Sequence, residues 1–279
     1  IDLSVGSIVG LTGMVTGGLL IEGIRLPGLA ATIYPNVPLI LLIDFALAIL
    51  IGLCSGQLIA RLKVPAFIAT LGAMYICRGA AMLRSGGATF PNLFGDAAKG
   101  NLGFDLIGAG SIPGVDVPYS ILIFAAMALI SAFIMKKTPL GNQIYAVGGN
   151  ERAAQLSGIK IHKVKVFVYI FSAVLAAMSG IIMTSQLRAA HPANGESWEM
   201  NAIASVVLGG TSMSGGVGTI GGTIIGVLVI TVLNDGMIMM GVSSFWQMVI
   251  KGVVIIVAVV IDLVQKDLQK KAALAARLK

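Results

Sequence analysis

Charged residues are scarce in this sequence of 279 residues, and their scarcity excludes an ordinary soluble domain. Asp, Glu, Lys and Arg make up 11% of the chain, whereas soluble domains carry about 25%. Apolar residues make up 57% and the mean hydropathy is +0.95, values typical of a membrane protein. The net charge of +7 does not predict nucleic-acid binding, because the basic residues fall in gaps between apolar blocks and form no continuous stripe. We therefore expect membrane lipid, and no nucleic acid, around this chain.

Cysteine clusters, metal-ligand spacings and catalytic motifs are also missing. Cys54 and Cys77 both lie inside apolar segments, which excludes a disulfide framework and a zinc spacing. His191 stands beside Pro192 without ligand partners nearby, so we expect no metal site. No nucleophile is paired with a base and no carboxylates cluster, so we expect no enzyme. The chain also lacks a GK[ST] phosphate loop, and any energy from ATP must therefore come from another polypeptide.

Long apolar blocks predict an all-α fold, a polytopic transmembrane helix bundle with about eight spans. Most blocks have about the 20 residues that cross roughly 30 Å of hydrocarbon. The apolar residues 201–208 are too few to span unaided, so the segment 201–213 runs partway or fully inward. The predicted segments are residues 3–21, 37–60, 66–83, 118–135, 167–185, 201–213, 217–234 and 245–261. The longest polar stretch, 84–117, is expected to form loops and short surface helices.

The carboxylates Asp2 and Asp44 are placed where they could have a role in transport. Asp2 and Ser4 precede the first block, where they either cap a helix or face a polar pathway. Asp44 lies about two turns into the second block, and a lone carboxylate at mid-helix costs on the order of 3 kcal/mol. Its side chain could reach the near interface, be protonated, or belong to a pathway.

A glycine-rich run at 209–219 interrupts the apolar sequence where the sixth block ends and the seventh begins. Irregular backbone at membrane depth is tolerated only where protein buries it or water lines it. We therefore interpret the run as a broken helix near a transport path. Gly218, Gly222 and Gly226 follow at steps of four, a spacing that predicts a helix-packing face.

The polar stretch 145–159 lies between long apolar blocks and predicts a short helix. Asn150 is suited to cap its start, Glu151 favours the positive end of the helix dipole, and Gly158 is suited to end it. The resulting two turns fall well below the roughly 12 residues at which an isolated helix becomes marginal in water. The stretch is thus either an ordinary interfacial loop packed on its own bundle or a docking element for another protein.

The distribution of basic residues predicts the orientation in the membrane. The turn 61–63, the segment 136–165 and the tail 264–279 hold thirteen lysines and arginines, against four in the opposing loops. Because such residues favour the cytoplasmic side, we expect 136–165 and the C-terminus there and 84–117 outside. The abrupt start at Ile1, directly before an apolar block and without a charged n-region, is not a signal peptide. We expect the natural N-terminus to be missing.

Four ordered segments resemble a known family. Residues 146–159 are similar to the cytoplasmic coupling loop of bacterial ABC importer permeases of the monosaccharide and branched-chain amino acid permease family. Residues 1–7, 202–218 and 241–247, the last followed by Lys251, match other segments of that family, so the resemblance covers essentially the whole chain. The glycine-rich and final segments look more like the ribose and galactose permeases than the amino-acid permeases. The resemblance implies one transmembrane permease domain over 1–279, with 136–165 as its cytoplasmic coupling loop and nine or ten spans in the full-length protein.

The resemblance also implies partners. They are an ATP-hydrolysing subunit that carries ATP and Mg, a periplasmic or lipid-anchored solute-binding protein, and a second, identical or different, permease chain in the bacterial inner membrane. This chain itself would bind no cofactor and would not be an enzyme. The residues implied to couple to the ATPase are Gly148, Gly149, Asn150, Glu151, Ala153, Ala154, Ser157 and Gly158.

The expected function is translocation of a monosaccharide, a ribose-like pentose or a hexose, through the permease. Uncharged sugars need hydrogen bonds rather than ion pairs, which suits the scarcity of buried charge. Candidate pathway residues are Asp2, Ser4, Asn201 and Gln247. Many sugar permeases carry Asp at the position of Asn201, so only a hydrogen-bonding role is expected there. The alternatives are transport of branched-chain amino acids or nucleosides, or an ion-driven secondary transporter that uses Asp44 and Asp235.

Overall fold

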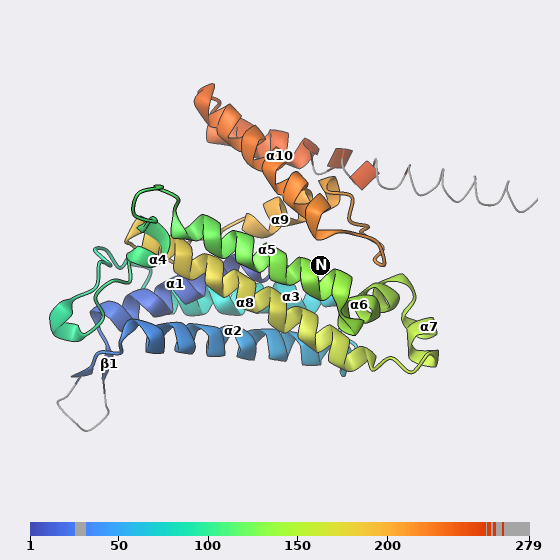
Figure 1. The fold of residues 1–279 in the computed structure, drawn as a ribbon, viewed down its shortest axis with the longest axis horizontal. Helices are drawn as coiled ribbons and strands as arrows, with labels where there is room; N and C mark the ends of the chain where they lie inside the picture. Colours follow the sequence, from blue (N-terminus) through green and yellow to red (C-terminus); the bar gives the residue numbers. More distant parts are fainter. Residues whose placement is uncertain (26–31, 255, 258, 261–263, 265–279) are drawn as a thin grey trace, which may run out of the picture. The chain divides into compact units, whose positions relative to one another are not determined.

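The structure is a computed structural model that describes residues 1–25, 32–254, 256–257, 259–260 and 264, and these residues are almost entirely helical (Figure 1). The all-α fold class is therefore confirmed. The only strands among the described residues are the short antiparallel pair β1 (Ile24–Arg25) and β2 (Thr32–Ile33). The helices are α1 (Val5–Ile21), α2 (Val37–Ala60), α3 (Ala66–Leu83), η1 (Ala97–Lys99), α4 (Leu106–Ala109), α5 (Tyr119–Lys137), α6 (Pro139–Gly149), α7 (Glu151–Leu156), α8 (Ile161–Leu187), α9 (Trp198–Leu208) and α10 (Ile220–Met239).

Five of the described helices, α2, α3, α5, α8 and α10, are long and apolar enough to cross a membrane. Two shorter apolar helices, α1 and α9, accompany them. Helical residues also cover 244–254, 256–257 and 259–260, whereas most of the basic tail lies outside the described residues. The count of eight spans stays a prediction. Helix α8 begins six residues before the predicted span at 167, because the helix includes His162, Lys163 and Lys165 and the apolar residues beside them.

The chain divides into two compact units, one of residues 1–127 and 160–199 and one of residues 128–159 and 200–279. We call them unit 1 and unit 2 and describe each by itself. The assignment of 1–279 to one domain stays a prediction.

Helix α1 is the centre of unit 1. Fourteen of its seventeen residues are buried, and it packs against α8, α3 and α2. A helix that is apolar all round suits a position surrounded by other helices. Small residues allow the close approach: a Cβ on Gly13 would lie 2.5 Å from the Thr184 hydroxyl, and one on Gly180 would lie 2.5 Å from the Val9 carbonyl oxygen.

Helices α2 and α8 also pack closely against each other in unit 1 (Figure 1). A Cβ on Gly52 would lie 2.6 Å from the Cα of Ile170, and one on Gly56 would lie 2.8 Å from the Cα of Val166. These contacts place the end of α2 beside the start of α8, so the two helices run antiparallel. Because Gly52 and Gly56 have no side chains, the backbones of α2 and α8 can approach this closely.

Asp44 points into unit 1 rather than to the surface. Its side chain is fully buried, and the Thr16 hydroxyl donates a hydrogen bond of 2.5 Å to its Oδ2 atom. The expectation that this carboxyl could reach the membrane interface is therefore wrong, because its side of α2 faces α1. Thr16 is the partner that the sequence did not reveal.

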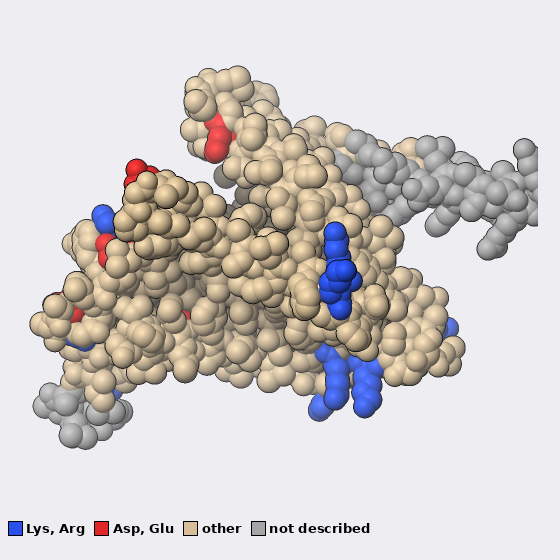
Figure 2. Space-filling view, viewed as in Figure 1, with Lys and Arg blue, Asp and Glu red and all other residues tan. Residues whose placement is uncertain are grey.

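Basic side chains gather at the end of unit 1 where α2 ends and α8 begins. The Arg61 Nε atom donates to His162 Nε2 over 3.0 Å, and the Gln57 Oε1 atom lies 2.9 Å from the same nitrogen. Lysine and arginine side chains project from this end in Figure 2, whereas the flank of α2 between its ends is uncharged. The basic turn at 61–63 and the segment 160–165 thus lie at the same end of the bundle.

Candidate coupling site

The segment from 138 to 159 folds in unit 2 as two consecutive helices. Thr138 caps α6 by accepting a hydrogen bond from the Gly141 N–H over 3.3 Å, and Pro139 occupies its first turn. Asn150 has an extended backbone and separates α6 from α7, and its Oδ1 atom accepts from the Ala153 N–H over 3.0 Å. Gly158 has a φ of +82°, the left-handed conformation that ends helices and favours glycine.

The short helix predicted from the sequence is thus present as α7, whereas α6 was not anticipated. Proline at the first helical position after a threonine cap is a known start signal. In this chain it follows directly on Lys136 and Lys137, which end α5. The sequence signal for α6 was therefore available at Thr138 and Pro139.

Most residues implied to contact the ATPase lie on the surface of α6 and α7. Ala154 is the exception, since it is only 4% exposed and lies on the buried side of α7. It cannot offer its side chain to a partner. The largest apolar side chain that α7 offers is Leu156, 91% exposed, which sequence reasoning missed because a single leucine in a polar stretch carries no periodic signal. The exposed coupling residues are Gly148, Gly149, Asn150, Glu151, Ala153, Ser157 and Gly158.

The glycine-rich run forms the loop between α9, which ends at Leu208, and α10, which begins at Ile220. The interruption predicted from the sequence is therefore present. Gly222 and Gly226 of α10 lie against α9, because a Cβ on either would collide with the backbone of Gly209 or Ser205. Gly218 lies in the loop, so it does not belong to the helical step that the spacing suggested.

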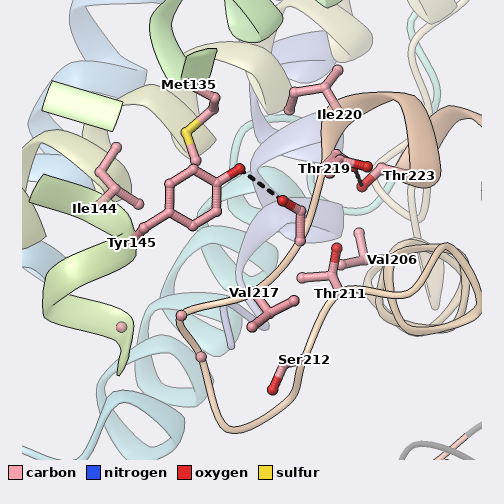
Figure 3. A pocket seen from close by; sticks show the side chains of 14 residues that line it. Met135, Ile144, Tyr145, Val206, Thr211, Ser212, Val217, Thr219, Ile220 and Thr223 are labelled. Carbon is pink, nitrogen blue, oxygen red and sulfur yellow. Dashed lines mark hydrogen bonds between the residues drawn. The ribbon is translucent and has the colours of Figure 1, made fainter. Parts of the chain in front are cut away.

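A cavity of about 300 Å³ lies in unit 2 between α6 and this loop (Figure 3). Tyr145 and Ile144 line it from α6, and Thr211, Val217 and Thr219 line it from the loop. The Tyr145 hydroxyl donates a hydrogen bond of 2.7 Å to the Gly218 carbonyl oxygen. The two stretches that the sequence singled out therefore both contribute to the cavity wall, although Tyr145 and Gly218 are 73 residues apart in the chain.

Of the predicted pathway residues, the structure brings Asp2 and Ser4 together. The Asp2 Oδ1 atom accepts from the Ser4 hydroxyl over 2.6 Å and from the Ser4 N–H over 2.9 Å. Its Oδ2 atom accepts from the Ser172 hydroxyl of α8 over 2.9 Å. Asp2 thus holds Ser4, the residue that precedes α1, and links it to α8, and Ser172 is a partner that sequence reasoning missed. The role of Asp2 and Ser4 in a pathway stays a prediction.

Asn201 and Gln247 belong to unit 2, whereas the Asp2 cluster belongs to unit 1. The Asn201 carbonyl oxygen accepts from the Ser205 hydroxyl over 2.8 Å. The Gln247 side chain donates from Nε2 to the Val242 carbonyl oxygen over 2.8 Å. Their role in a pathway stays a prediction.

Within the described part of the chain, no three His, Cys, Asp or Glu side chains are grouped so that they could hold a metal ion. The described ion pairs, Arg84 with Glu22 at 2.6 Å and Arg188 with Asp105 at 3.2 Å, are partly exposed and tie loops of unit 1 together. Neither pair is placed to perform chemistry.

The chain is similar in sequence to known membrane permeases. The family model described as "Branched-chain amino acid transport system / permease component" matches residues 1–259. The chain is 44% identical to a ribose import permease protein of Haemophilus influenzae and 41% identical to one of Bacillus subtilis, covering 94% of this chain and 76% of each relative. It is 32% identical to a xylose transport system permease protein of Haemophilus influenzae, covering 94% of this chain and 81% of that relative. None of the solved structures matches the chain.

Proposed function

Since the chain belongs to the family of branched-chain amino acid transport system permease components, we propose that it is the permease subunit of an ABC importer that carries a monosaccharide. It is a multi-pass membrane protein and a transporter rather than an enzyme. The observation that carries the choice of substrate is the likeness to ribose and xylose permeases at 32–44% identity over 94% of the chain. A galactose/methyl galactoside import permease protein is also similar, at 35% identity.

The α6–α7 segment is the proposed docking element for the ATPase. Helix α7 has six residues and presents Leu156 outward while Ala154 holds it from within. A helix this short is not stable by itself in water, and an exposed apolar side chain beside polar neighbours suits a protein interface. ATP and Mg would be bound by that ATPase, and this chain would hold no cofactor.

The proposed orientation places the α6–α7 segment, the turn 61–63 and the C-terminus in the cytoplasm. The contact of Gln57 and Arg61 with His162 supports it, because two basic segments then lie at one end of unit 1, as the preference of basic residues for the cytoplasm requires. The outer side would receive sugar from a periplasmic or lipid-anchored solute-binding protein. A second permease chain would complete the path in the bacterial inner membrane.

The alternative substrate class is branched-chain amino acids, which the description of the family favours. A zwitterion would require paired charges along the path. Asp44, the fully buried carboxylate of α2, is instead hydrogen-bonded to Thr16. An ion-driven transporter would use Asp44 and Asp235 as its coupling carboxylates, and it would take up substrate without ATP.

Uptake into proteoliposomes tests these proposals. The permease is reconstituted with an ATPase subunit and a solute-binding protein of the same importer. Radiolabelled D-ribose, D-xylose, D-galactose and L-leucine are then offered with and without internal ATP. ATP-dependent uptake of one of the sugars and not of leucine is the expected result. Leucine uptake would support the alternative substrate, and uptake driven by an ion gradient without ATP would overturn the proposal.

A further inference from the structure

We propose that Tyr145 and Gly148 of α6 form a joint that transmits movement of the coupling segment to the broken helix α9–α10. The inference rests on the proposed function, because it names the residues through which docking would act on the transport path. Tyr145 is a positioning residue in this proposal, since it acts on the path through α10. Helix α6, the loop 209–219, α10 and the part of α9 from residue 200 onward all belong to unit 2.

The first contact of the joint is a close approach of backbone to backbone. A Cβ on Gly148 would lie 2.7 Å from the Gly216 nitrogen, and one on Gly216 would lie 2.7 Å from the Cα of Gly149. Gly215 and Gly216 have φ values of +90° and +77°, which L side chains rarely adopt. Only glycines fit here, so the backbones of α6 and the loop are in direct contact. No flexible side chain lies between them.

The second contact lies on the same face of α6, since Tyr145 precedes Gly148 by three residues. The Tyr145 hydroxyl donates to the Gly218 carbonyl oxygen over 2.7 Å (Figure 3). Two contacts along one helix face resist both sliding and rotation of α6 against the loop. A single contact would allow α6 to pivot.

The loop is internally bonded, so it transmits displacement instead of absorbing it. The Ser212 N–H donates to the Val217 carbonyl oxygen over 2.9 Å, and the Gly215 N–H donates to the Ser212 carbonyl oxygen over 3.1 Å. Thr219 follows directly after Gly218 and caps α10, accepting from the Gly222 N–H over 3.0 Å. A displacement at Gly218 therefore reaches the first turn of α10.

Helix α10 in turn carries α9 with it. A Cβ on Gly222 or on Gly226 would collide with the carbonyl oxygen of Gly209 or of Ser205, respectively. Movement of α6 would therefore tilt α9 and α10 as a pair.

The first test measures sugar uptake per ATP hydrolysed in the reconstituted complex. Tyr145→Phe removes only the hydroxyl, and the loss of one hydrogen bond is expected to lower uptake per ATP about three- to tenfold while the ATPase subunit still binds. Gly148→Ala is expected to lower the same ratio because its Cβ separates α6 from Gly216. A purely structural defect would lower uptake and ATP hydrolysis together and leave their ratio unchanged.

The matched controls make the same chemical changes elsewhere. Tyr75→Phe removes a hydroxyl from a side chain that is 69% exposed, and Gly221→Ala adds a Cβ that meets nothing within 4 Å. Both are expected to keep the wild-type ratio. A Tyr145→Phe complex that also keeps it overturns the proposed joint.

The second test uses the permease alone in detergent and does not depend on the substrate. Amide hydrogen exchange in residues 212–218 is expected to be about fivefold faster in Tyr145→Phe and unchanged in Tyr75→Phe. Unchanged exchange in Tyr145→Phe overturns the joint. If the wild-type complex imports none of the three sugars, the proposed function fails, and the exchange measurement still decides whether α6 holds the loop.

Discussion

Leu156 is the most exposed large apolar side chain among the described residues, at 91%, and it offers the sharpest test of docking by α7. Burying a leucine side chain fully stabilises a complex by about 1.5–3 kcal/mol. A loss of 1.4 kcal/mol corresponds to a factor of about ten in affinity. Truncation by Leu156→Ala is therefore expected to weaken binding of the ATPase subunit about 10- to 100-fold.

The assay is a titration of purified ATPase subunit onto the detergent-solubilised permease, with Kd as the result. The thermal midpoint of the permease alone should not change, because the side chain contacts little in the folded chain. Leu102→Ala is the matched control, since Leu102 is 67% exposed and lies in the segment 84–117 that is predicted on the outer side. Its Kd should equal that of the wild type.

An unchanged Kd for Leu156→Ala would refute the reasoning, because the most exposed apolar group of α7 would then remain outside the interface. A weaker Kd for both variants would show that the loss is not specific to α7. Only a loss confined to Leu156→Ala supports docking at this helix.

Three further changes test the local structure. Asn150→Ala removes the cap of α7 and should destabilise that helix by about 1 kcal/mol, seen as faster amide exchange across α7; unaltered exchange would contradict the capping role. Gly52→Ala should lower the free energy of unfolding by about 1–3 kcal/mol through overpacking. Gly72→Ala is the control and should not lower it, because a Cβ on Gly72 would meet nothing within 4 Å. Equal thermal midpoints of the two variants would refute the close contact of α2 and α8. Thr16→Val leaves the Asp44 carboxyl without its hydrogen-bond donor and should lower the free energy of unfolding by about 1–3 kcal/mol. Adding Asp44→Val to the same chain should recover much of that loss, measured by thermal unfolding. A double variant that recovers nothing would argue against the Thr16–Asp44 hydrogen bond.

The membrane class and the coupling helix could be predicted from the sequence because their signals are local. Scarce charge and apolar blocks of about 20 residues indicate spans by themselves. Asn150 and Gly158 mark the two ends of α7 through their intrinsic cap and turn preferences. The glycine-rich run likewise indicated an interruption between α9 and α10.

Contacts between distant segments could not be predicted from the sequence. Lipid is as apolar as a protein core, so hydrophobic periodicity does not show which side of a membrane helix faces its neighbours. Nothing in the pattern therefore indicated that Asp44 faces Thr16 or that α1 is enclosed by α2, α3 and α8. The burial of Ala154 beside the exposed Leu156 is equally invisible in a single polar stretch.

The sequence by itself determined that this protein is a helical membrane protein with a short polar helix between its apolar blocks, because composition, block length and cap residues act locally. Only the tertiary structure decided what that helix is joined to. Tyr145 and Gly218 are 73 residues apart and meet through a hydrogen bond. Gly148 and Gly216 meet because neither has a side chain to keep the backbones apart. Such a meeting depends on how the whole unit folds, and no local propensity contains it.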